Sequence, residues 1–225
     1  MKKRSLSVVW PILGLLALAA ACAAQTERVD WPQGLDEAAL LQASAEEPGA
    51  WTYLDPSADR ASYRRFILDP PRVYRGSDPS SFAGLSDADV TAIAPMFVEE
   101  TRRALGTTYP VVTAPGPGVA RLRFTVLGVS KTVPYVSTAS RVIPIGAAIT
   151  LLSQGAGHGG TLTGSVTYGI EAFDAPSGKL VAAAVRRLTP GAFDISSTLG
   201  TLDTARAVAR DAAAKLRARL DSFHA

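Results

Sequence analysis

Two neighbouring stretches decide the fold of this chain: LTGSVTYGIEAFD at residues 162–174 and KLVAAAVRRLT at residues 179–189. The four residues between them, Ala175–Gly178, have the sequence APSG, whose proline and glycine are typical of a tight turn. Along the first arm every second position is apolar, which gives the strand one core-facing side: Val166, Tyr168, Ile170 and Ala172. The two stretches therefore predict an antiparallel β-hairpin.

Two long helices are predicted, over residues 86–105 and 202–223. In the first, Ser86 is a natural N-cap with Asp89 three residues further on, and Gly106 ends the helix. Its buried face is predicted by apolar or small residues at helical spacing: Val90, Ile93, Phe97, Thr101 and Leu105. The second helix carries a comparable stripe, which we expect to pack on a sheet: Leu202, Ala205, Ala209, Ala212, Leu216, Leu220 and Phe223.

Two more strands complete the predicted order of elements. Arg65–Leu68 is rich in apolar residues and runs into the rigid turn Asp69–Pro71. Ala120–Val129 alternates apolar and polar residues, which indicates a half-exposed strand. The order β-α-β-insert-β-β-α predicts an α+β two-layer sandwich, in which two long helices cover a mainly antiparallel sheet of about four strands. We expect a single domain over residues 51–225.

The N-terminus predicts export and lipidation. Residues 1–21 have the form of a signal peptide, with a basic start, an apolar stretch at Val8–Leu18 and small residues at Ala19–Ala21. Cys22 is the only cysteine and stands where a lipoprotein signal places the residue that receives the acyl chains. Ordinary secretion with cleavage near Ala21 or Ala23 is the alternative, because Ala19 replaces the usual large aliphatic residue. The apolar stretch is too short to span a membrane.

The expected address is the cell envelope. An Asp after the cysteine favours the inner membrane, and Ala23 stands there instead, so we expect the outer membrane, with the domain facing the periplasm. Residues 22–50 are predicted to be a tether between the lipid and the domain. Removal of the three basic residues of the signal takes the formal charge of +3 to zero, which does not indicate nucleic-acid binding. A lone cysteine leaves no disulfide framework.

Several short motifs, in this order, resemble one known family. They are Cys22 after its signal, YRRFILDP at 63–70, YPVV at 109–112, PGPG at 115–118, GIEAFD at 169–174 and SGKL at 177–180. Together they resemble the bacterial lipoproteins classed as domain of unknown function 3313, from the signal to the end of the hairpin. The resemblance implies an envelope lipoprotein and brings no reaction, cofactor or catalytic residue with it.

Candidate catalytic and ligand-binding residues are few. Gly155–Gly160 matches the pattern G-x-G-x-x-G, but a strand rather than a helix is predicted after it, so we expect a loop. The two histidines, His158 and His224, lie without a carboxylate cluster at ligand spacing, and we expect no metal and no cofactor. Glu171 and Asp174 are three apart, on opposite faces of an ideal strand, which argues against a catalytic pair. We expect Asp174 to support the hairpin turn.

The apolar insert within residues 130–160 is the expected interaction surface. Residues 136–152 carry one formal charge, Arg141, and a series of large apolar residues: Val136, Val142, Ile143, Ile145, Ile149, Leu151 and Leu152. One hypothesis packs these side chains on the edge of the domain. The other exposes them to a partner or to the bilayer interface, because exposed apolar patches mark interaction sites.

The sequence therefore favours a non-catalytic lipoprotein of the outer membrane that acts through an envelope protein. The alternative is a module that binds a small apolar ligand or a lipid, with residues 136–152 as its lid. An enzyme is the third hypothesis and requires Glu171 or His158 to meet other polar groups in space.

Overall fold

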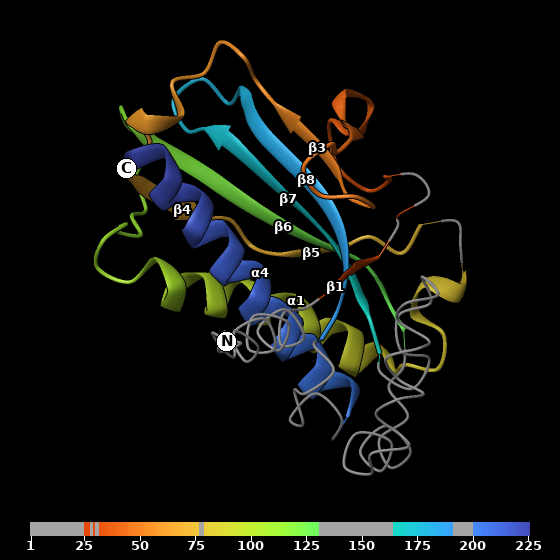
Figure 1. Ribbon diagram of the computed structural model, residues 1–225. Coiled ribbons are helices and arrows are strands. Elements are labelled where there is room, and N and C mark those ends of the chain that lie inside the picture. Colours follow the sequence, from red (N-terminus) through yellow and green to blue (C-terminus); the bar gives the residue numbers. More distant parts are fainter. Residues whose placement is uncertain (1–24, 28, 30–31, 77–78, 131–163, 191–199) are drawn as a thin grey trace, which may run out of the picture.

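This computed structural model describes residues 25–27, 29, 32–76, 79–130, 164–190 and 200–225. The strands among these residues form one mixed sheet (Figure 1). Its strands are β1 (Gln25–Glu27), β2 (Gln42–Ala43), β3 (Trp51–Leu54), β4 (Arg65–Leu68), β5 (Arg72–Val73), β6 (Val119–Val129), β7 (Val166–Asp174) and β8 (Leu180–Thr189). The strand order is β2-β3-β8-β7-β6-β4, with β1 also paired to β8 and β5 also paired to β6. β4 and β5 run parallel to β6, and the other pairs are antiparallel.

The α+β class and the predicted element order are confirmed, as β4, α1, β6, β7, β8 and α4 along the chain. The predicted sheet of about four strands is too small, because β1, β2, β3 and β5 also join it. These four strands have two to four residues each. A strand this short shows no alternation in sequence, so only the neighbouring strand that pairs with it defines it.

Two helices cover one face of the sheet, α1 (Asp87–Leu105) and α4 (Thr201–His224), and Figure 1 shows them side by side. The described residues also form three short 3₁₀ helices: η2 (Ala38–Leu40), η3 (Arg60–Ser62) and η4 (Pro79–Phe82). Ser86 caps α1 as predicted, since its Oγ accepts a hydrogen bond from the backbone N–H of Asp89 at 3.1 Å. Gly106 follows α1 with a φ of 55°, which favours glycine.

The main core lies between these helices and the sheet. Phe97 of α1 is fully buried and lies 4.9 Å from Tyr168 and 5.9 Å from Phe124, measured between ring centroids. The predicted apolar positions of α1 are all buried, and those of α4 face the same core. Packing of both helices on the sheet is therefore confirmed.

The opposite face of the sheet is covered by the segment that was expected to be a tether. Leu35 and Leu41 are buried against β8, in a second cluster that includes Val185. Trp51 donates a hydrogen bond from its Nε1 to the carbonyl of Val29 at 2.7 Å. The prediction of a tether over residues 22–50 is thus wrong for residues 25–27, 29 and 32–50, which join the sheet or cover it.

Gly169 tests how closely this covering segment is packed. A Cβ at Gly169 would lie 2.4 Å from Cδ1 of buried Leu35, so Gly169→Ala should reduce the free energy of unfolding by about 1–3 kcal/mol. In a Leu35→Ala background the same change should have little effect, because the clashing atoms are gone. Urea denaturation of the parent, the two single variants and the double variant measures the coupling energy between Gly169 and Leu35. Gly116→Ala is the control, since nothing lies within 4 Å of its new Cβ. If the effects of Gly169→Ala and Leu35→Ala on the free energy of unfolding simply add, the prediction is contradicted.

Candidate functional site

Many of the residues singled out by sequence lie outside the described residues. These are Cys22, Gly155–Gly160 with His158, and the insert positions Val136, Val142, Ile143, Ile145, Ile149, Leu151 and Leu152. Their roles stay predictions. The residues that the structure does place are Glu171, Asp174 and His224.

Glu171 and Asp174 do not meet, as their spacing predicted. Asp174 ends β7, and its Oδ2 accepts hydrogen bonds from the backbone N–H of Ser177 at 2.9 Å and from the Ser177 hydroxyl at 2.5 Å. These bonds and the hydroxyl of Tyr63 hold the pKa of Asp174 below its usual range. The expected turn role of Asp174 is confirmed.

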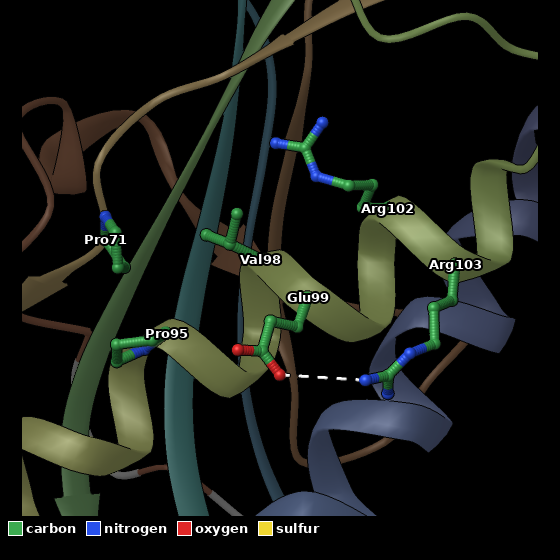
Figure 2. Close-up of a pocket in the computed structure, with 6 residues that line it drawn as sticks. All are labelled: Pro71, Pro95, Val98, Glu99, Arg102 and Arg103. Atoms are coloured by element: carbon green, nitrogen blue, oxygen red, sulfur yellow. Dashed lines mark ion pairs between the residues drawn. The ribbon is translucent and has the colours of Figure 1, made fainter.

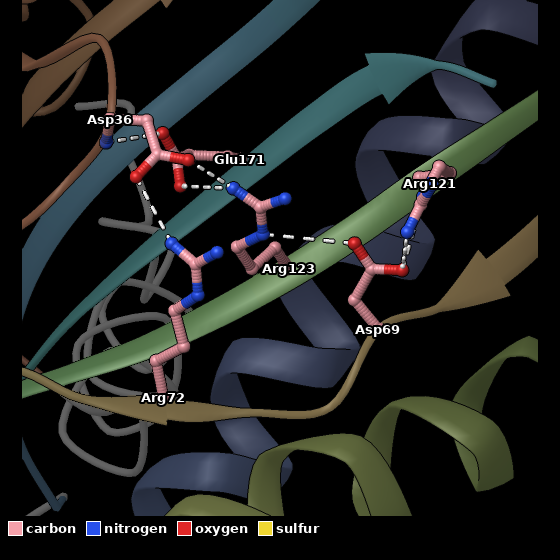
Figure 3. Close-up of polar contacts among 6 residues, drawn as sticks. All are labelled: Asp36, Asp69, Arg72, Arg121, Arg123 and Glu171. Carbon is pink, nitrogen blue, oxygen red and sulfur yellow. Dashed lines mark hydrogen bonds and ion pairs between the residues drawn. The ribbon is translucent and has the colours of Figure 1, made fainter. Parts of the chain in front are cut away.

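Glu171 lies in a charge network on the face of the sheet opposite the helices (Figure 3). It stands across from Arg123 in the pairing of β7 with β6, and its Oε2 lies 4.0 Å from Nη1 of Arg123. Its Oε1 accepts a hydrogen bond from the backbone N–H of Asp36 at 3.0 Å. The carboxylate of Asp36 in turn receives Arg123 and, at 3.0 Å, Arg72.

Asp69 extends this network at the turn after β4. Its Oδ1 accepts two hydrogen bonds from Arg121, at 2.8 and 3.1 Å, and its Oδ2 lies 3.7 Å from Nε of Arg123. Three arginines and three carboxylates therefore balance one another. The Arg123 guanidinium also lies 4.8 Å from the ring centroid of Phe173. The network clamps the segment around Asp36 onto β6 and β7.

Glu171 is the buried member of the network that lacks one hydrogen bond. Its side chain is only 2 % exposed, and Oε2 has no hydrogen-bond partner. Burial raises the pKa of Glu171, and the nearby negative charge of Asp36 raises it further. A group so covered cannot contact a substrate in solution, so the arrangement favours a structural role over general acid–base catalysis.

A second polar cluster joins the C-terminus of α4 to the end of α1. The hydroxyl of Tyr109 lies 2.8 Å from Oδ1 of Asp221 and 3.0 Å from Nδ1 of His224. His224 Nε2 lies 3.1 Å from the carbonyl of Ala61, which can only accept, so this nitrogen carries the hydrogen. Arg217 donates to the last carbonyls of α1 at Ala104 and Leu105. Sequence reasoning missed this cluster, because Tyr109 and His224 lie 115 residues apart.

The chain connections gather at one end of the sheet, which we call the connection pole. There β1 begins, β6 ends, β7 begins and β8 ends: Gln25 pairs with Thr189, and Val129 pairs with Val166. The hydroxyls of Ser130 and Ser165 lie 3.0 Å apart just beyond the last pair, and the Ser165 N–H donates to Ser130 Oγ at 2.7 Å. Figure 1 shows α1 and α4 beginning near this same end.

A cleft of about 370 Å³ lies between α1 and the turn that joins β4 to β5 (Figure 2). Pro71, Pro95 and Val98 form its apolar wall, and Glu99, Arg102 and Arg103 form its charged rim. Arg103 pairs with Glu99 at 3.7 Å and with Glu100 at 2.5 Å. Arg102 is exposed and has no ion pair with any other residue that the structure describes.

A metal site and a membrane-spanning helix are not found in the described part of the chain. No group of three or more His, Cys, Asp or Glu side chains there is placed to hold a metal ion. Among the same residues, no helix is long and apolar enough to cross a membrane.

The fold is that of a small α+β protein with two helices on one face of a mixed sheet. A family model described as a protein of unknown function (DUF3313) matches residues 33–216, and the chain belongs to this family. No curated protein matches the chain.

Among solved structures, the chain is similar to a point variant of the PelC dodecamer from Paraburkholderia phytofirmans. The identity is 14%, the match covers 76% of this chain and 97% of that chain, and the TM-score is 0.41. It is also similar to protein XCC0632 from Xanthomonas campestris, of family DUF330. That match has 10% identity, covers 75% of this chain and 93% of that chain, and has a TM-score of 0.38.

The raised pKa of Glu171 predicts an opposite pH dependence to that of Asp174. Glu171 holds its proton better in the folded state, so its stabilising effect is complete at low pH and is lost as pH rises. Glu171→Gln, which keeps an acceptor for the Asp36 N–H, should raise the free energy of unfolding near neutral pH by about 1 kcal/mol. The gain should disappear toward about pH 4.5.

Asp174→Asn is the matched variant with the opposite sign. The pKa of Asp174 is lowered, so its contribution is present at neutral pH and is lost on acidification. This variant should be less stable than the parent at neutral pH and approach it at low pH. Urea denaturation from neutral pH to below 3.8, the ordinary pKa of an aspartate, measures both variants. Parallel pH profiles of the two variants would contradict the assignment.

Proposed function

We propose that this protein is a lipoprotein of the outer membrane that faces the periplasm and acts through a protein partner rather than through catalysis. The observation that carries the proposal is the connection pole. The proposed lipid attachment site, Cys22, precedes Gln25 by three residues, and Gln25 begins β1 at this pole. Both ends of the apolar insert leave from the same place, at Ser130 and Gly164.

The insert is the proposed partner surface. Its ends are held together by the Val129–Val166 pair and the Ser130–Ser165 bonds, so the intervening 33 residues, 131–163, form a single excursion from the β6–β7 hairpin. Seven of them are the large apolar side chains noted above, and such side chains gain free energy when another surface covers them. An envelope protein that is already at the membrane is the partner that this position favours.

The described carboxylates support a non-catalytic role. Glu171 is covered by the segment that carries Asp36, and Asp174 is engaged by its own turn. The Tyr109, Asp221 and His224 side chains bond to one another and link elements of the fold. Each of these polar groups already has a structural task.

Metabolic labelling with radioactive palmitate tests the anchor. The full chain, expressed with its own signal, should incorporate label and stay with outer-membrane fractions, because two or three acyl chains bind a bilayer firmly. Cys22→Ala should lose the label and fractionate with soluble periplasmic proteins. Membrane association without label would contradict lipidation as the mode of attachment.

Photo-crosslinking in living cells tests the partner surface. A photoreactive residue at Val136, Ile145 or Ile149 should give a discrete adduct with one envelope protein, identified by mass spectrometry. The same residue at Arg206, exposed on α4, is the control and should give none. Adducts with lipid alone, or no adduct at any insert position, would contradict a protein partner at this surface.

A second candidate function, binding of a small apolar ligand, is favoured by the α1 cleft. Its volume falls in the range of ligand pockets, and the uncompensated Arg102 suits a carboxylate beside the apolar wall. A fluorescent fatty acid should bind the parent and lose at least tenfold in affinity with Val98→Asp, since a charge would enter the apolar wall. Arg75→Gln, away from the cleft, is the control; equal binding by parent and Val98→Asp would contradict this function.

A further inference from the structure

We infer that the connection pole is the surface of this protein that lies on the phospholipid bilayer, and that β1 holds it there without a long tether. This inference rests on the proposed lipidation of Cys22 and adds an orientation to it. The occupant of the surface is the bilayer itself.

The first step is the length of chain between lipid and sheet. Three peptide units join Cys22 to Gln25, and an extended chain advances at most about 3.5 Å per residue. The Cα of Gln25 therefore lies within about 11 Å of the Cα that carries the acyl chains. Gln25 pairs with Thr189 at the end of β8, so that strand end is equally constrained. A free tether over residues 22–50 would have allowed about 100 Å.

The N-terminal segment is held on the sheet by contacts other than the pairing of β1 as well. Val29 donates its backbone N–H to the carbonyl of Gly49 at 3.0 Å and accepts the indole N–H of Trp51 at 2.7 Å. Leu35, a few residues further on, is buried against the sheet. If β1 opened, the free chain would grow only to the seven peptide units that join Cys22 to Val29, about 25 Å.

The third step identifies which side chains face the bilayer. Ser81 of η4 packs near Gly128 at the end of β6, which places the exposed Ala83 beside the connection pole. The helix α4 begins near the same end (Figure 1), and its first turn contains the exposed Asp203. At the start of α1, Asp87 is paired with Arg75 at 2.8 Å. We expect the anchor and the β1 pairing, rather than attraction to anionic lipid, to set the orientation.

The far end of the molecule must then point away from the membrane. The hairpin turn that contains Ser177 closes β7 and β8, whose nine or ten residues span about 30 Å. Ser177 is exposed. The C-terminal end of α4 lies toward this far end too, since His224 bonds to Ala61 of η3 and Arg64 bonds to Gly118 before β6.

Quenching by lipid-bound nitroxide tests the orientation. The full lipidated chain, with one added cysteine carrying a maleimide dye, is reconstituted in phosphatidylcholine vesicles whose headgroups bear nitroxide. A dye at Ala83→Cys or Asp203→Cys should lose at least half of its emission, and a dye at Ser177→Cys should lose little. Adding phosphatidylglycerol should leave both results unchanged. Equal quenching at the two ends, or quenching that requires the anionic lipid, would overturn the inference.

A linker variant tests the cause of the orientation. About 20 Gly and Ser residues inserted between Ala24 and Gln25 have a root-mean-square length of about 25 Å and leave β1 intact. This insertion should abolish most of the quenching at Ala83. The same linker between Pro176 and Ser177, in the exposed hairpin turn, is the matched control and should leave it unchanged. Full quenching with the long anchor linker would overturn the role of β1.

The parent chain separates a failure of this inference from a failure of the proposed function. A lipidated Cys22 is a thioether and does not react with maleimide, whereas a free Cys22 does. Labelling of the parent would overturn the proposed lipidation and this inference together. A parent that incorporates palmitate and does not react with maleimide, with equal quenching at Ala83 and Ser177, would overturn the orientation alone.

Discussion

The constraint on which the structure depends is that the sheet around β6, β7 and β8 has two faces to bury. The helices α1 and α4 cover one face, with Phe97, Phe124 and Tyr168 in close contact. They cannot reach the other face, which the N-terminal segment covers through Leu35 and Leu41. A segment with little regular secondary structure thus becomes part of the core. The short strands β1, β2 and β3 form because this segment is held along the edge beside β8.

This cover also explains the charge network. Glu171 and Arg123 face each other across β7 and β6 on the face away from the helices, where an uncovered sheet would leave both in water. The segment that carries Asp36 removes the water and supplies a backbone N–H and a carboxylate in its place. One carboxylate oxygen of Glu171 keeps no hydrogen bond, so the clamp holds at some cost in desolvation. A network of this kind selects one position for the segment rather than adding much stability.

The same segment relates the fold to the proposed lipid anchor. Because β1 pairs with the last residues of β8, whatever precedes Gln25 is brought to the pole where β6 ends and β7 begins. The chain belongs to a family whose name records no activity. The carboxylates of Asp36, Asp69, Glu171 and Asp174 are engaged in contacts within the fold. The distinctive feature of this structure is where the chain leaves the sheet. The segment before Gln25 and both ends of the apolar insert leave it at the connection pole.

The sequence by itself determined the elements whose signals are local. The hairpin around Ala175–Gly178, the cap at Ser86 and the apolar stripes of both helices follow from periodicity and turn chemistry within a few residues, and the structure confirms them. Only the tertiary structure decided the short strands, the covering segment and the two polar clusters. Asp36 and Glu171 are 135 residues apart, and Tyr109 and Asp221 are 112 apart. A one-residue shift in the register of β7 would move Glu171 to the other side of the sheet. The pair of Tyr109 and Asp221 depends instead on how α4 packs against the end of α1.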